Sequence, residues 1–458
     1  MNRSNIRSQF FKYIVFNIIS TLGISVYILI DTYFIAKGMG ADGLAALNLC
    51  LPVFNFINGF GLMLGIGDGS KFSMLYCHVE RRETDKIFTN AFYAALMISA
   101  VFELTGIFFS RQVTMLLGAD SSIFDMAHSY LRTVLLFSPA FILNQLLVNF
   151  MRNDCAPKLA MAGVLGSSAA NVVLDYVFIF QYNMGMRGAA LATCIAPFIS
   201  MAIMSIHFLT GWNAFQLRRI RPSKEITKNI VSLGLYSLLT ECSGGIVILV
   251  FNFVIYRLLG NTGIAAYGII ANLAIVFTAI FTGLSGGVQP LMCSLRGEHD
   301  EKGIRYLCRI SVITAVILAA GAYIALYLKT GTLVALFNSD AQTQLQSVAE
   351  HGLRLYFLFM PFMGINSIFT VYFTACELPT AAQVVSLLRG ALLVVPLAFV
   401  FYFTRSINGI WLTIPIAELL TLGVSSVISF YIAKPYGVYV YRYQPKERTI
   451  PTSNKNLT

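Results

Sequence analysis

The chain has 458 residues, of which 57% are hydrophobic and 12% are charged, with a mean hydropathy of +0.72. A soluble protein carries about 25% charged residues, so the composition excludes a soluble globular protein. The net charge of +11 does not indicate nucleic-acid binding, because the basic residues lie mostly between long apolar segments, the positive-inside pattern of membrane proteins. We expect a multi-pass protein of the cell membrane, in contact with the lipid bilayer and with no nucleic-acid partner.

Twelve apolar segments long enough to span a bilayer follow one another along the chain. They cover about 13–36, 44–76, 87–110, 126–151, 158–181, 188–211, 228–258, 263–294, 304–328, 348–375, 380–403 and 408–433. Most Lys and Arg residues of the connections lie before the first segment, in every second connection and in the tail. We therefore expect both termini to face the cytoplasm.

The two halves of the chain repeat each other at a shift of about 220 residues. KGMGADGLAALN at 37–48 aligns with RLLGNTGIAAYG at 257–268, and SYLRTVLLFSP at 129–139 aligns with HGLRLYFLFMP at 351–361. Each half has an even number of segments, so the repeats are parallel, as in some transporters with alternating access. We predict an all-α integral membrane protein with two pseudo-symmetric six-helix bundles, at 1–214 and 229–434. A basic linker at 215–228 joins them, and a polar cytoplasmic tail follows at 435–458.

Polar side chains on four segments of the first half lie at a similar depth. At 1.5 Å per helical residue they fall roughly 6–10 Å below the outer face: Asp31, Tyr130, Asp175 and Thr193, with Asn171 one turn deeper on the face of Asp175. The second half has Phe251, Gly352, Leu397, Ile414 and Leu393 at the equivalent positions. A requirement of the fold alone would appear in both halves, so we predict a polar pocket in the first half only.

The pair Asp31 and Asp175 indicates a site for a coupling ion. Two carboxylates in a dry pocket cannot both stay charged cheaply, so one is protonated or a cation lies between them. A Na⁺ ion could be held by the side-chain oxygens of Asp31, Asn171, Asp175 and Thr193. Binding of a proton by the carboxyl pair is equally compatible with the sequence. A lone intramembrane Asp can instead serve only helix packing, but the whole constellation favours function.

Glu241, Arg389 and Glu418 lie nearer the midplane of the second half. Arg389 with one of these glutamates could form a structural ion pair, whereas a spare acid could meet a cationic substrate; both readings stay open. Asp68 and Lys71, near the cytoplasmic end of the second segment, are expected to be solvated. No nucleophile–base or metal-ligand set is recognisable, so we expect neither an enzyme nor a cofactor apart from the coupling ion.

Three stretches resemble the multidrug and toxic compound extrusion (MATE) transporters: IDTYFIAKGMGADGLAALNLCLP, NVVLDYVFIFQYNMGMRGAALAT and AAYGIIANLAIVFTAIFTGLSGGVQPLM. The resemblance covers about 1–435 and implies export of cationic or amphipathic compounds in exchange for H⁺ or Na⁺. In the DinF-like branch the ion site is similar to Asp31, Asn171, Asp175 and Thr193, with a tyrosine like Tyr130 nearby. The NorM-like branch has a second site with acids in spans seven and ten. Glu241 is similar to the first acid, but Asn366 replaces the second, which favours the DinF-like branch.

We therefore expect a secondary active multidrug antiporter that works as a monomer by alternating access, with Glu241, Asn366, Arg389 and Glu418 as candidates for substrate contact. The alternative is a lipid-linked oligosaccharide or lipid flippase of the same superfamily. A flippase would need a cavity rich in Arg and Lys to bind phosphate, and only Arg389 lies clearly within an apolar segment.

Overall fold

The computed structural model describes residues 3–75, 81–119, 121–211, 213–220, 223–335 and 343–433, and every regular element in these ranges is a helix. The first half contains α1 (Arg3–Leu75), α2 (Arg81–Phe108), α3 (Ser110–Leu116), α4 (Phe124–Leu136), α5 (Ser138–Asn153), α6 (Pro157–Tyr176), the π-helix η1 (Val177–Gln181) and α7 (Gly185–Leu209). The second half contains α8 (Lys224–Gly297), α9 (Glu301–Ala335), α10 (Thr343–Tyr356), the 3₁₀-helix η2 (Phe357–Phe359), α11 (Met360–Ala375), α12 (Pro379–Leu387), the π-helix η3 (Leu388–Leu392), α13 (Leu393–Phe403) and α14 (Ile407–Ala433). The tail predicted at 435–458 lies outside the described residues.

The expected all-α membrane fold is confirmed. Among the described residues, 11 helices are long and apolar enough to cross a membrane, and the number rises to 12 when α4 and α5 count as one bent span. These two helices are bent by 52°. Pro139 stands in the first turn of α5, and since proline has no N–H and its ring clashes with the preceding turn, it favours a break or bend at this point.

Helices α1 and α8 each contain two spans joined at a glycine. Gly40 has φ 68° and Gly260 has φ 61°, the left-handed region that glycine enters at little cost. The sequence predicts a short loop at each of these places. Instead, the helix turns at one residue, and this residue belongs to the repeated Gly-containing motif of both halves.

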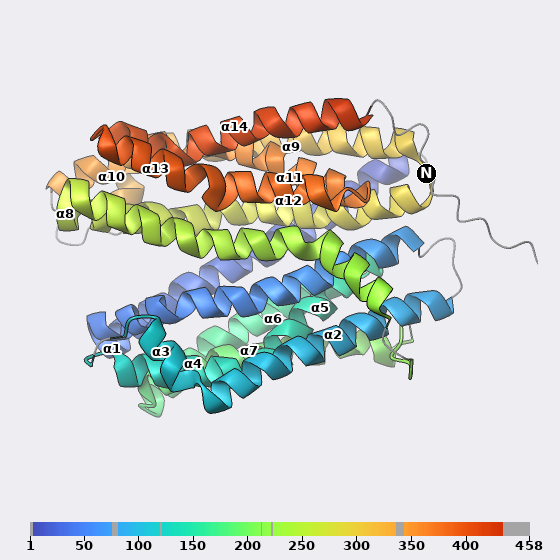
Figure 1. The fold of residues 1–458 in the computed structure, drawn as a ribbon, viewed down its shortest axis with the longest axis horizontal. Coiled ribbons are helices and arrows are strands. Elements are labelled where there is room, and N and C mark those ends of the chain that lie inside the picture. Colours follow the sequence, from blue (N-terminus) through green and yellow to red (C-terminus); the bar gives the residue numbers. More distant parts are fainter. Residues whose placement is uncertain are drawn as a thin grey trace, which may run out of the picture.

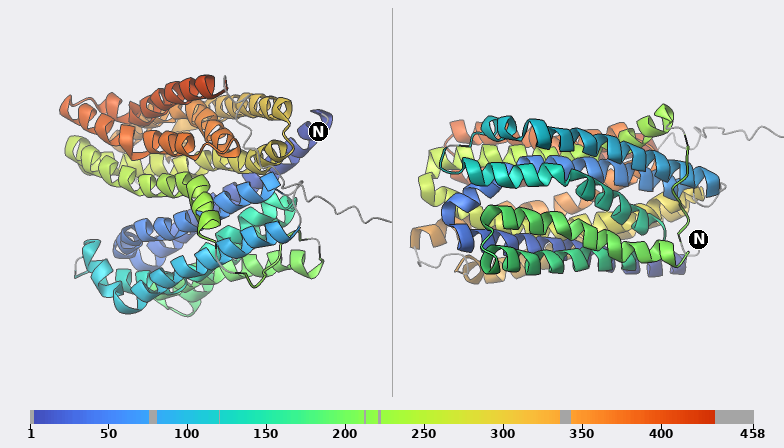
Figure 2. Two further views of the ribbon diagram at one scale, coloured as in Figure 1. Left: turned by 45° about the vertical axis from the view of Figure 1, so that its right-hand side comes forward. Right: turned by 90° about the horizontal axis from the view of Figure 1, so that it is seen from below.

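Figure 1 shows two bundles, with most of α1 and α2–α7 below and α8–α14 above, and with the N-terminus at one end of the molecule. The first turns of α1 lie beside the upper bundle, where Ile6 and Phe10 share an apolar cluster with Leu291. Each bundle has an apolar core of its own: Leu64, Phe72 and Phe150 belong to the first, and Phe251 and Trp411 to the second. We call the end with the N-terminus the basic end. Figures 1 and 2 show the bundles close together there and diverging towards the bends of α1 and α8.

Glycines allow the bundles to touch at the basic end. A Cβ added to Gly67 would collide with the Ile230 carbonyl oxygen, and a Cβ added to Gly234 would collide with the Met63 carbonyl oxygen. Close approach of backbones is a use of glycine that no other residue can serve. Farther from this end, Gly244 has nothing within 4 Å of an added Cβ. The end of the second span of α1, near Gly67, and the start of α8, near Gly234, thus form a closed contact between the bundles.

Candidate ion-coupling site

Asp31 and Asp175 come together inside the first bundle. Asp31 lies on the first span of α1 and Asp175 in the last turn of α6, and both are buried. Their carboxyl groups lie within hydrogen-bonding range of each other. Within the described part of the chain, Oδ1 of each group has no hydrogen-bond partner. A carboxyl pair of this kind holds a shared proton or binds a cation, because two adjacent buried negative charges are unstable.

Asn171 and Thr193 complete one side of the pair. When the Asn171 amide oxygen faces the Thr193 backbone, it accepts from the Thr193 N–H at 3.3 Å and its nitrogen donates to Asp175 Oδ2 at 3.1 Å. The Thr193 hydroxyl lies 3.5 Å from the Asn171 amide and donates to the Ala189 carbonyl at 3.1 Å. Asn171 is one turn before Asp175 on α6, so the same helical face presents both side chains.

Two tyrosines lie near the carboxyl pair. The predicted Tyr130, on α4, is almost fully buried and lies within electrostatic range of both Asp31 and Asp175. Tyr27 does the same, although the sequence analysis did not include it. It stands four residues before Asp31, so both point to the same side of α1. That spacing is the pattern that could have identified it.

The helix next to the site departs from α geometry. Directly after Asp175 and Tyr176, the chain continues as the π-helix η1, a rare feature that is frequent at functional sites. Phe180 of η1 and Tyr176 pack on Phe34, which lies one turn after Asp31, with ring centroids 5.6 and 6.3 Å away. These rings form an aromatic cluster next to the pair, between Asp31 and the bend at Gly40 along α1.

The second bundle fills the equivalent place with aromatic rings. Phe251, the counterpart of Asp31, is buried, stacks on Tyr267 at 5.3 Å and lies 6.4 Å from Tyr356. Gly352, the counterpart of Tyr130, leaves room for Trp411, whose ring would lie 2.9 Å from an added Cβ. The first bundle therefore has a polar pocket where the second has an apolar cluster.

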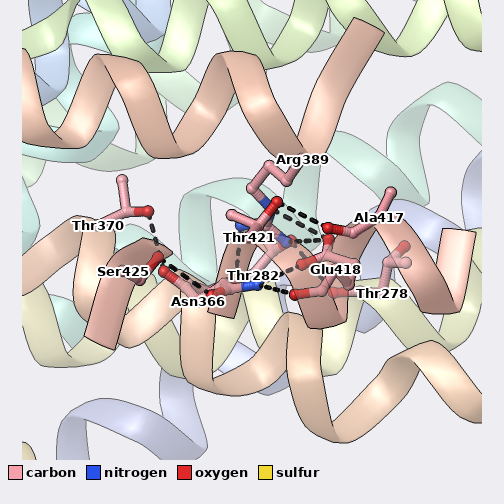
Figure 3. A network of polar contacts seen from close by, with 10 residues as sticks. Thr278, Thr282, Asn366, Thr370, Arg389, Ala417, Glu418, Thr421 and Ser425 are labelled. Carbon is pink, nitrogen blue, oxygen red and sulfur yellow. Dashed lines mark hydrogen bonds and ion pairs between the residues drawn. The ribbon is translucent and has the colours of Figure 1, made fainter. Parts of the chain in front are cut away.

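Arg389 and Glu418 form a buried ion pair in the second bundle. Arg389 Nε and Nη2 donate to Glu418 Oε1 at 3.1 and 3.0 Å, and Arg389 Nη1 donates to Ser367 at 3.0 Å. Asn366 donates to Glu418 Oε2 at 2.7 Å. Figure 3 shows Arg389 and Asn366 approaching the carboxylate from different helices. Of the two readings left open by the sequence, the geometry supports a structural network that links η3, α11 and α14.

Glu241 lies apart from this network, on the first span of α8. Its Cβ would be 3.3 Å from a Cβ added to Gly59 of α1, so it faces the other bundle and is half-buried. One turn farther from the basic end, Gly244 and Gly245 meet open space. Glu241 is therefore the acid that stands where the contact between the bundles ends.

The expectation that Asp68 is solvated is wrong. Its side chain is fully buried, and neither carboxylate oxygen has a hydrogen-bond partner in the described part of the chain. Lys71 does not pair with it; instead, Lys71 forms an ion pair of 2.8 Å with Glu377 of the second bundle. The sequence suggested solvation because Asp68 lies near a helix end, but the direction of the side chain depends on how the helix packs.

The fold and the site together define a membrane transporter of two pseudo-symmetric helical bundles. The family model MatE matches residues 17–177 and 237–400, and the chain belongs to this family, the MATE transporters. It is 28% identical over 395 residues to the multidrug export protein MepA of Staphylococcus saprophyticus, covering 86% of each chain. It is 27% identical over 413 residues to MepA of Staphylococcus aureus, covering 88% of each chain.

Solved structures share the fold. One shows the outward-facing conformation of a multidrug resistance MATE family transporter of the MOP superfamily, with a TM-score of 0.88 at 20% identity over 94% of this chain and 96% of that chain. Another is a MOP superfamily transporter from Pyrococcus furiosus, with a TM-score of 0.87 at 19% identity and the same coverage. Its description notes a binding pocket of reversed polarity and suggests a different function.

Proposed function

We propose that the protein is a secondary active antiporter that exports cationic or amphipathic drugs in exchange for H⁺ or Na⁺, as the DinF-like resemblance implies. The observation that carries this proposal is the contact between Asp31 and Asp175, two carboxyl groups from different spans in one buried pocket. MepA, the relative described as a multidrug export protein, supports the substrate class. The basic end faces the cytoplasm in this proposal, as the positive-inside rule requires.

The ion drives the cycle through this pocket. With the basic end closed, an ion from the outside reaches Asp31 and Asp175 and removes their mutual repulsion. The first span of α1 and α6 then repack around the neutralised pair, and the bundles open towards the cytoplasm, where the ion leaves. A one-unit pH difference supplies about 1.4 kcal/mol per proton, and the membrane potential adds about 2.3 kcal/mol per charge per 100 mV.

Glu241 is the substrate contact that the geometry favours. It lies at the limit of the closed interface, whereas Glu418 is already neutralised by Arg389. A half-buried acid between the bundles attracts an organic cation by charge. The same ion pair argues against the alternative flippase, since the guanidinium of Arg389 is occupied by a carboxylate and is not offered to a phosphate.

Efflux from proteoliposomes tests the proposal. Asp31→Asn and Asp175→Asn keep the shape of the side chain but cannot titrate, so each should abolish gradient-driven efflux of a panel of cationic dyes while the protein stays folded. Separate pH and Na⁺ gradients identify the coupling ion. Leu397, the counterpart of Asp175 in the second bundle, provides the matched control: Leu397→Asn should leave the ion dependence intact. Normal efflux by either aspartate variant would refute the coupling role.

A further inference from the structure

Asp68 is a buried acid that the mechanism above does not use. It lies in the sequence GIGDGS of α1, between three glycines that bring neighbouring helices close. An added Cβ on Gly65 would lie 2.8 Å from the Asn149 amide of α5, and one on Gly69 would collide with the Asn153 amide. On the other side, Gly67 touches Ile230 of the second bundle. Asp68 is thus one residue away from the contact between the bundles.

The side chain of Asp68 faces an apolar interior. Leu64 and Phe72, one turn to either side of Asp68 and therefore on its face of the helix, both belong to the core of the first bundle. Phe72 packs on Phe150 and on Phe215, with centroids 5.5 and 5.8 Å away. Phe215 belongs to the segment that links the two bundles. The cover over Asp68 therefore includes the connection that must move when the bundles rock.

Most of the charged groups on the helices around Asp68 are paired with other residues, and Arg152 points towards α8. Asp85 of α2 accepts from Arg218 and from the Gln216 N–H, Asp154 after α5 pairs with His207 at 2.8 Å, and Lys71 pairs with Glu377. Arg152 of α5 lies against Gly286 of α8. The Asp68 side chain itself is fully buried, and neither of its carboxylate oxygens has a hydrogen-bond partner among the described residues. A fully buried carboxylate without a protein partner is strongly disfavoured in its ionised form, so the group is neutral here.

We propose that Asp68 is a second proton-binding site, which holds a proton while the basic end is closed and releases it to water at that end when the bundles separate. On opening, the contact of Gly67 with Ile230 and the hydrogen bond from Gln289 of α8 to Ser70, 2.8 Å in the closed form, are lost. The linker residue Phe215, which packs on Phe72 next to Asp68, shifts with the bundles, and water then reaches the carboxylate from this side. The O–H bond of Asp68 breaks and the proton passes to water; closing reverses the step.

The consequence is a conformational equilibrium that depends on the pH at the basic end. The closed form binds one proton more than the open form, so low pH favours closure, by up to about tenfold per pH unit for one proton. This effect is separate from the ion exchange at Asp31 and Asp175, because the proton enters and leaves at the same end. It would tune the exporter to the pH of the compartment on that side.

Distance measurements between spin labels test the inference. Lys158 of α6 and Lys302 of α9 are exposed on different bundles at the basic end. Each is replaced by a spin-labelled cysteine in an otherwise cysteine-free full-length protein in lipid nanodiscs. The distance between the two labels then reports whether the basic end is closed. Asp31→Asn and Asp175→Asn are present throughout, which removes the titration of the other site. We expect the closed fraction to rise as the pH falls from about 9 to about 5. Asp68→Asn should keep the protein closed at every pH, and Asp68→Glu should restore the dependence.

Two outcomes would overturn the inference: no pH dependence in the protein that retains Asp68, or an unchanged dependence after Asp68→Asn. If Asp68→Asn does not fold, a second measurement replaces that variant: the infrared carbonyl band of a protonated carboxylic acid in the protein that retains Asp68. That band should disappear as the pH rises and shift in frequency with Asp68→Glu; a band that does neither contradicts the inference. Efflux is not part of the readout, so loss of ion-coupled efflux and loss of this pH dependence are scored independently.

Discussion

Removing one partner of the Arg389–Glu418 pair should destabilise the protein strongly. In Arg389→Leu, the Glu418 carboxylate loses two hydrogen bonds of 3.1 and 3.0 Å and its counter-ion, and Asn366 is the one partner left to it among the described residues. Its side chain is 6% exposed, so water cannot replace what is lost. Breaking a buried pair in this way costs about 3–5 kcal/mol.

The double variant separates the pair from its neighbours. Arg389→Leu with Glu418→Gln leaves no unpaired charge, and we expect it to cost about 0–2 kcal/mol, less than either single change. Denaturant unfolding of the purified protein in detergent gives the free energies. Arg305→Leu is the matched control, because its pair with Glu301 is exposed and should be worth less than about 1 kcal/mol. Additive losses in the double variant, or a single loss as small as the control, would refute this reasoning.

Three other predictions follow from the same contacts. Gly67→Ala should open the basic end by about 1–3 kcal/mol, because the new methyl group meets the Ile230 carbonyl oxygen, which belongs to a backbone; spin-label distances measure this, and Gly244→Ala, which meets nothing within 4 Å, should have no effect. Glu418→Gln should leave the range of exported dyes unchanged, because Arg389 already neutralises this acid; a changed range in the efflux assay would assign Glu418 a substrate contact. Asp300 lies between two spans and caps α9 through a hydrogen bond of 2.8 Å from the Gly303 N–H, which lowers the pKa of its carboxyl group. Asp300→Ala should therefore cost about 0.5–1 kcal/mol at neutral pH, and the difference in unfolding free energy from the unaltered protein should fade as the pH drops below about 4, where the cap loses its charge; a difference that persists in acid would contradict this account.

Properties that depend on the local chain could be predicted from the sequence. The apolar lengths of the spans determine that the chain crosses a membrane, because each backbone polar group in lipid must be satisfied within a helix. The 1.5 Å rise per residue places Asp31 and Asp175 at one depth, and the repeat shows that the second half lacks their counterparts. Gly40 suits the left-handed backbone of the turn and Pro139 suits the first turn of a new helix, although the sequence predicted a short loop at Gly40.

The directions of side chains around each helix axis depended on tertiary packing. Depth along a span does not determine which neighbour a side chain contacts. The structure shows that Glu418, and not Glu241, is the partner of Arg389. It also places Tyr27 near the carboxyl pair, which the sequence analysis did not predict. Asp68 appeared to be a solvated residue near a helix end, yet three glycines let the surrounding helices close over it. The sequence by itself determined which residues cross the membrane, whereas the packing of the two bundles decided which of the charged residues are paired, buried or free to titrate.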